Sequence, residues 1–60
     1  MTKEYDVRRM ARIILTIKKA ANELKEASDG IQAVNRNVDR ISAVVRILEI
    51  NVSDVASIEE

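Results

Sequence analysis

The sequence predicts an all-α protein whose chain folds back on itself as an antiparallel two-helix hairpin. Apolar residues recur at alternating steps of three and four, first along residues 7–24 and again along residues 31–55, and this spacing is typical of helices with one buried stripe. A Ser28-Asp29-Gly30 break separates the two ladders and predicts a bend. We expect helices over about residues 4–28 and 30–56, in a single domain of residues 1–60.

The first helix is predicted from its N-terminal charges and its uninterrupted ladder. Glu4 and Asp6 lie where the helix dipole favours negative charge. Glu4 can also pair with Arg8 one turn later. The chain contains no Pro and one Gly, so little in the sequence interrupts a helix before residue 28.

The junction favours a turn. Gly30 suits the position that follows a helix C-terminus, where a left-handed backbone is common. Asp29 and Gln32 have the spacing of a capping box for the second helix. One continuous long helix in a coiled coil is the alternative fold, because a Gly inside a helix costs only about 1 kcal/mol.

Folding the chain at this junction aligns the two ladders. Val52 then lies level with Val7, and Val45 lies level with Ile14. The predicted helix–helix core comprises Val7, Met10, Ile14, Ile17, Ala21, Leu24, Ile31, Val34, Val38, Ile41, Val45, Leu48 and Val52.

Charge is unevenly distributed, although the formal net charge of the chain is zero. Residues 1–19 contain six basic and two acidic side chains, whereas residues 20–60 contain four basic and eight acidic ones. The hairpin is therefore expected to bring Arg8, Arg9 and Arg12 near Glu49 and Asp54. Exposed ion pairs contribute about 0–1 kcal/mol each, so they favour an orientation more than they stabilise the fold.

Self-association is expected because the chain is small and its apolar arcs are wide. A chain of 60 residues buries a limited core, and without Cys or His it has no disulfide and few metal ligands to support the fold. Apolar side chains beyond the seam suit helices that each contact two neighbours. We expect a homo-oligomer, a dimeric four-helix bundle, whose interface uses Ile13, Ala20, Ile47 and Ile50.

The residue types argue against catalysis. Neither Cys nor His is present to act as a nucleophile or a general base, so we expect no enzyme, no cofactor and no metal. No apolar run approaches the roughly 18 residues of a membrane span. The N-terminal residues also lack the apolar region of a signal peptide, so we expect a cytoplasmic protein without a membrane partner.

A basic stripe on the first helix makes nucleic acid a possible partner. Arg8, Arg12 and Lys19 fall within about 40° on the polar side of this helix, and Arg9 lies nearby. Two such stripes in a two-fold assembly could contact a phosphate backbone. The zero net charge and the lack of an aromatic residue in the stripe favour this partner less than a protein.

The opening of the chain resembles that of the Rop family. The matching residues are Met1-Thr2-Lys3 and Met10-Ala11-Arg12, followed by Ile13-Ile14. This family consists of plasmid RNA-binding proteins built as dimers of helical hairpins, so the resemblance implies that architecture and RNA binding by the first helix. On its RNA-facing helix this family has an aromatic residue, and Ile13 stands near the corresponding position in this chain.

These observations predict a small, non-enzymatic, homo-oligomeric helical interaction module. We expect an adaptor, inhibitor or regulatory protein, with a phage or plasmid gene as its origin, that binds an unidentified protein partner. The alternatives are a Rop-like dimeric RNA binder and a structural coiled-coil segment of a larger assembly.

Overall fold

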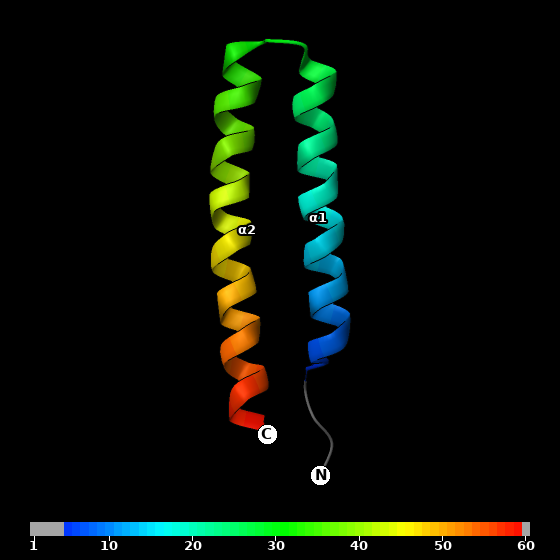
Figure 1. Ribbon diagram of the computed structural model, residues 1–60, viewed down its shortest axis with the longest axis vertical. Helices are drawn as coiled ribbons and strands as arrows, with labels where there is room; N and C mark the ends of the chain where they lie inside the picture. The colour runs from blue at the N-terminus through cyan, green and yellow to red at the C-terminus, as the bar shows by residue number, and fades with distance from the viewer. Residues whose placement is uncertain (1–4, 60) are drawn as a thin grey trace.

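The structure, a computed structural model, describes the backbone of residues 5–59 and the side chains of residues 5–57. Helix α1 spans Val7–Ser28 and helix α2 spans Gln32–Glu59. The two helices lie side by side and antiparallel, joined by a short turn (Figure 1). The predicted hairpin is confirmed, and the alternative of one continuous helix is wrong.

Helix α1 begins at a side-chain cap. Asp6 has an extended backbone, and its Oδ1 accepts a hydrogen bond from the backbone N–H of Arg9 at 3.0 Å. This bond satisfies one of the N–H groups that the first turn of a helix leaves without a partner. The helix thus starts later than the predicted residue 4, and Glu4 lies outside the described residues.

The turn uses two consecutive residues with positive φ. Asp29 adopts the left-handed helical conformation (φ 47°, ψ 47°), and Gly30 follows with φ 93°. The N–H of Ile31 donates to the carbonyl of Ser28 at 3.2 Å, which closes the turn. This geometry ends α1 because a left-handed residue directs the chain away from the helix axis.

The start of α2 differs from the predicted capping box. Asp29 lies three residues before the first helical residue, Gln32, so it does not occupy the N-cap position. Ile31 does, and its carbonyl accepts the first helical bond, from the N–H of Asn35 at 3.0 Å. Because the turn needs both Asp29 and Gly30, the second helix starts later than the predicted residue 30.

The core is a narrow seam between the helices. Among the side chains of residues 5–57, four apolar ones are buried: Ile14 and Ala21 from α1, and Val38 and Val45 from α2. When the chain folds at the turn, Ile14 lies level with Val45, and Ala21 lies level with Val38. The two buried apolar residues of each helix are seven residues apart. Ala21 and the two valines are small, which allows the helices to approach closely. This limited core belongs to a hairpin that extends 49 Å along its longest axis.

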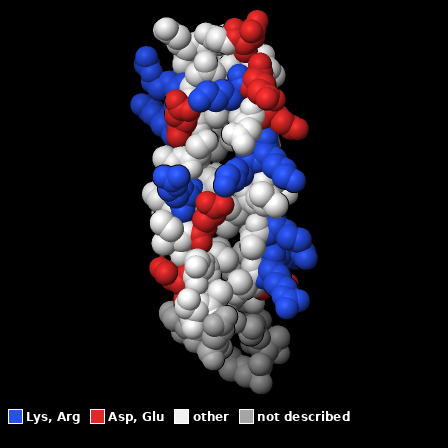
Figure 2. All heavy atoms as spheres, in the orientation of Figure 1, with Lys and Arg blue, Asp and Glu red and all other residues white. Residues whose placement is uncertain are grey.

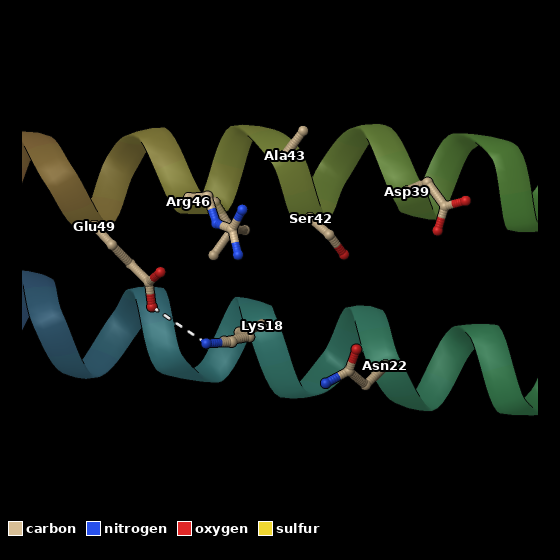
Figure 3. Close-up of a pocket in the computed structure, with 8 residues that line it drawn as sticks. Lys18, Asn22, Asp39, Ser42, Ala43, Arg46 and Glu49 are labelled. Carbon is tan, nitrogen blue, oxygen red and sulfur yellow. Dashed lines mark hydrogen bonds and ion pairs between the residues drawn. The ribbon is translucent and has the colours of Figure 1, made fainter.

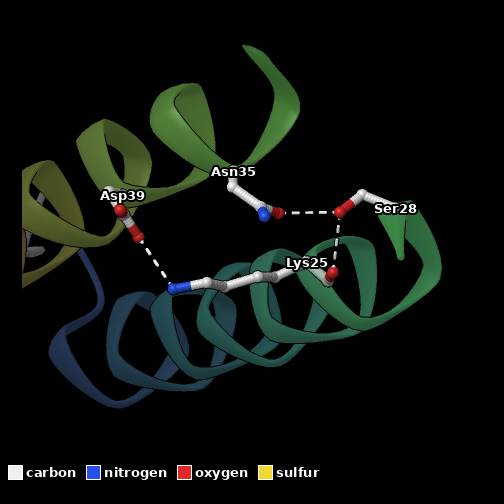
Figure 4. Close-up of polar contacts among 4 residues, drawn as sticks. All are labelled: Lys25, Ser28, Asn35 and Asp39. Atoms are coloured by element: carbon white, nitrogen blue, oxygen red, sulfur yellow. Dashed lines mark hydrogen bonds and ion pairs between the residues drawn. The ribbon is translucent and has the colours of Figure 1, made fainter. Parts of the chain in front are cut away.

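Ser28 continues the buried row of α1 at the same seven-residue step. Its side chain is buried beside the turn, and Oγ lies 2.8 Å from the carbonyl oxygen of Lys25 and 2.7 Å from Oδ1 of Asn35 (Figure 4). The hydroxyl has one proton, so it donates to one of these oxygens at a time. A polar contact thus joins α1 to α2 where the ladder of Ile14 and Ala21 would place a further apolar residue.

Neither α1 nor α2, as far as the structure describes them, contains a stretch long and apolar enough to cross a membrane.

Candidate functional site

Two ion pairs between the helices define one long side of the hairpin. Lys18 Nζ lies 3.5 Å from Glu49 Oε2, and Lys25 Nζ lies 3.0 Å from Asp39 Oδ1. We call this side the charged side. Because side chains on a helix lean toward its N-terminus, a lysine on α1 and an acid on α2 lean toward each other in an antiparallel pair. The two ion pairs therefore show that the flank of α1 with Lys18 and Lys25 and the flank of α2 with Glu49 and Asp39 lie on the same long side of the hairpin.

A shallow groove of about 500 Å³ follows the charged side. Figure 3 shows its polar side chains, contributed by both helices. The groove is lined by Lys18, Asn22, Asp39, Ser42, Ala43, Val45, Arg46 and Glu49. Two cations and two anions balance one another there. Among the residues that the structure describes, in the groove and elsewhere, no group of three or more His, Cys, Asp or Glu side chains could hold a metal ion.

The opposite long side of the hairpin is apolar. Positions around α1 are given as angles from Ile14, at about 100° per residue. In the direction away from Lys18 and Lys25, Ile17 lies at about 60°, Leu24 at about 80° and Ile13 at about 100°. Three residues of α2 occupy the matching flank. We call the six residues the apolar face: Ile13, Ile17, Leu24, Ile41, Val44 and Leu48.

The apolar face is exposed and uncharged. Its six side chains retain between 36% and 53% of their accessible surface. On this flank, the arc between about 40° and 120° from the seam contains no charged residue within Val7–Ser28 or within residues 32–57. Within residues 32–57, the polar side chains in this arc of α2 are Asn37 and Asn51. A contiguous exposed apolar surface of this kind usually marks a site of contact with another molecule.

The predicted core divides between the seam and this face. Ile14, Ala21, Val38 and Val45 are buried, and a second group of predicted core residues is half-buried. The half-buried residues are Val7, Met10, Val34 and Val52. The remaining five are exposed within a single hairpin: Ile17, Leu24, Ile31, Ile41 and Leu48. One neighbouring helix covers only part of each apolar arc, so burial of the exposed group stays a prediction that depends on a further chain.

The predicted oligomer interface does not form one surface. Ile13 and Ala20 lie on the flank of the apolar face, about 100° and 120° from Ile14. Ile47 and Ile50 lie on the outer side of α2, more than about 130° from Val45, and both are exposed. A single flat contact with one further copy therefore cannot use all four residues. Helix periodicity alone could have shown this separation.

The basic stripe lies on the outer side of α1. Arg8, Arg12 and Lys19 are exposed, and they form no ion pair with any side chain that the structure describes. Figure 2 shows basic side chains along the outer edge of the N-terminal half of this helix. The charge distribution predicts that the hairpin brings Arg8, Arg9 and Arg12 near Glu49 and Asp54. Among the described side chains, Glu49 pairs with Lys18, and these arginines form no ion pair.

Comparison of the chain with protein-family models, curated proteins and solved structures found no match.

Proposed function

We propose that this protein is a non-enzymatic, homodimeric helical interaction module. Two hairpins pack through their apolar faces and form a four-helix bundle. The outer sides then stay available to a protein partner, for which the dimer acts as an adaptor, an inhibitor or a regulatory protein. The observation that carries the proposal is the uncharged face formed by Ile13, Ile17 and Leu24 of α1 together with the three residues of α2.

The exposed area supports this assembly. The chain exposes 5161 Å², whereas a compact monomer of its mass, 6.8 kDa, exposes about 4,000 Å². The excess of about 1,200 Å² per chain is of the order that a stable protein–protein interface buries. Apolar arcs this wide are typical of helices that contact two neighbours each.

Sedimentation equilibrium with two matched variants tests the proposal. Ile17→Glu places a charge on the apolar face, and Ile50→Glu places the same charge on the outer side of α2. We expect dimer mass for the wild-type chain and for Ile50→Glu, and monomer mass for Ile17→Glu. The midpoint of thermal unfolding of the wild-type chain should also rise with protein concentration, because association stabilises the folded state by mass action.

Two outcomes would contradict the proposal. A wild-type chain that remains monomeric and fully helical at micromolar concentration would show that the apolar face is tolerated without a partner copy. A dimer that persists in Ile17→Glu but dissociates in Ile50→Glu would place the contact on the outer side of α2 instead.

A second candidate function is nucleic-acid binding by the basic stripe. It is favoured by the lack of ion pairs at Arg8, Arg12 and Lys19 among the described side chains. Affinity for RNA or DNA should fall steeply with added salt, because each neutralised phosphate releases counterions. Fluorescence anisotropy of the wild-type chain and of Arg8→Glu/Arg12→Glu measures this. Equal affinity of the two proteins would eliminate this candidate.

A further inference from the structure

We propose that the two copies in the dimer pack with their turns at the same end, so that α1 of each copy lies beside α2 of the other. This inference rests on the proposed function, because it requires a dimer formed through the apolar face. It specifies which surfaces of the second copy each helix contacts.

Symmetry leaves two arrangements of aligned hairpins. A two-fold axis parallel to the helices puts both turns at one end and places α1 beside the partner's α2. A two-fold axis across the helices puts the turns at opposite ends and places α1 beside α1 and α2 beside α2. Both bury the apolar face and both make all neighbouring helices antiparallel. The choice therefore depends on the charges that border this face.

The two helices carry different net charges. Helix α1, Val7–Ser28, contains six basic and two acidic residues, for a net charge of +4. Helix α2, Gln32–Glu59, contains three basic and four acidic residues, for a net charge of −1. The same-end arrangement puts helices of opposite charge side by side. The opposite-end arrangement puts two helices of charge +4 side by side, which like-charge repulsion disfavours.

Individual charges on the outer sides of the helices, beyond the apolar face, also fit the same-end arrangement: Arg9 and Arg40 lie about 140° around their helices from the seam, and Glu23 and Asp54 lie about 180° from it. Rotation about an axis parallel to the helices leaves every axial height unchanged, so the levels within one hairpin also hold between copies. Heights along the bundle are counted from Ile14 and Val45, which are level. Asp54 of the second copy lies four residues farther toward the open end of the hairpin than the position of α2 that is level with Arg9. Arg40 of the second copy lies four residues past the level of Glu23.

An ion pair within the hairpin has nearly the same stagger. On the charged side, Asp39 lies five residues past the level of Lys25, and the two groups are 3.0 Å apart. Long side chains that lean toward their helix N-termini bridge this offset. The slightly smaller offset of four residues therefore allows pairs of Arg9 with Asp54 and of Glu23 with Arg40 between copies.

The arrangement also separates the basic stripes. In the same-end dimer the two α1 helices occupy diagonally opposite corners of the bundle, so the stripes of Arg8, Arg12 and Lys19 face opposite directions. In the opposite-end dimer the two α1 helices would be neighbours, so both stripes would lie on the same side of the bundle.

Distances between spin labels distinguish the arrangements, and the chain has no native Cys to interfere. Ser57→Cys places a label at the open end of α2, and Ser42→Cys places one near its middle, away from the apolar face. For Ser57→Cys we expect about 15–30 Å, from interaxial distances of about 10 Å. Opposite ends would give about 40 Å, from the 1.5 Å rise per residue. Both arrangements give a short distance for Ser42→Cys, which serves as the control.

The outcomes separate the two proposals. A short distance at both positions supports the same-end dimer. A long distance at Ser57 with a short one at Ser42 overturns this inference and leaves the proposed dimer intact. Monomer mass without coupling at either position overturns both.

Charge reversal gives an independent readout with opposite signs. In the same-end dimer, Arg9→Glu should weaken association roughly two- to fivefold per lost pair, and Arg9→Glu/Asp54→Arg should restore it. In the opposite-end dimer, Arg9→Glu would reduce repulsion between the two α1 helices and tighten association, which would overturn the inference.

Discussion

Ser28 and Asn35 meet across the turn with 2.7 Å between the hydroxyl oxygen of one and the amide oxygen of the other. The contact joins the last residue of α1 to the first turn of α2, and it occurs where the hairpin has little apolar core. Its position indicates that a hydrogen bond, as well as apolar packing, holds the turn end closed.

A double-mutant cycle measures this bond. Ser28→Ala should destabilise the hairpin by about 1 kcal/mol, the net value of a typical intramolecular hydrogen bond. Asn35→Ala should cost a similar amount, and the double variant should cost less than the sum of the two. The measurement is urea unfolding followed by circular dichroism. Strictly additive effects would show that the two side chains do not interact in solution.

Val45→Asp should unfold the hairpin. Val45 is 3% exposed in the middle of the seam, and an aspartate there would be a buried charge without a partner, which costs several kcal/mol. That cost exceeds the few kcal/mol that a core of this size supplies. Far-ultraviolet circular dichroism measures the loss of helix. Ile47→Asp, two residues away on the exposed outer side, is the control and should retain its helical signal.

Gly30→Ala should lower stability by about 1 kcal/mol through backbone strain. Gly30 has φ 93°, and an added Cβ would meet no atom within 4 Å, so crowding makes no contribution. Differential scanning calorimetry should show a fall of the unfolding midpoint of about 4–8 °C. Gln32→Ala, an exposed position at the start of α2, is the control and should shift it little. An unchanged midpoint in Gly30→Ala would indicate that the turn relaxes without strain.

Asp6→Ala should remove the cap of α1. The carboxylate accepts the N–H of Arg9, and loss of such a cap costs about 0.5–2 kcal/mol. Amide hydrogen exchange should accelerate at the first turn of α1, around Val7 and Arg9, and change less at Ala21. Unchanged protection at Arg9 would mean that the bond contributes little in solution.

The exposed isoleucines and leucines show the limit of sequence reasoning about the core. Periodicity assigns Ile17 and Leu24 to the same ladder as Ile14 and Ala21, because all four lie on one helical stripe. The stripe is wider than one neighbouring helix can cover. Which part of it is buried depends on the rotation of α1 relative to α2, and local sequence does not encode that rotation.

The sequence by itself determined two helical segments and favoured a turn at Asp29-Gly30, because the roughly 3.6-residue period and the tolerance of glycine for positive φ act locally. The structure decided for the antiparallel hairpin and against one continuous helix. Only the tertiary structure decided which residues line the charged side and which line the apolar side of the hairpin. The pairs of Lys18 with Glu49 and Lys25 with Asp39 join residues that are distant in the chain, and they place these two lysines of α1 and these two acids of α2 on one side. Six exposed apolar side chains, those of the apolar face, lie on the other side.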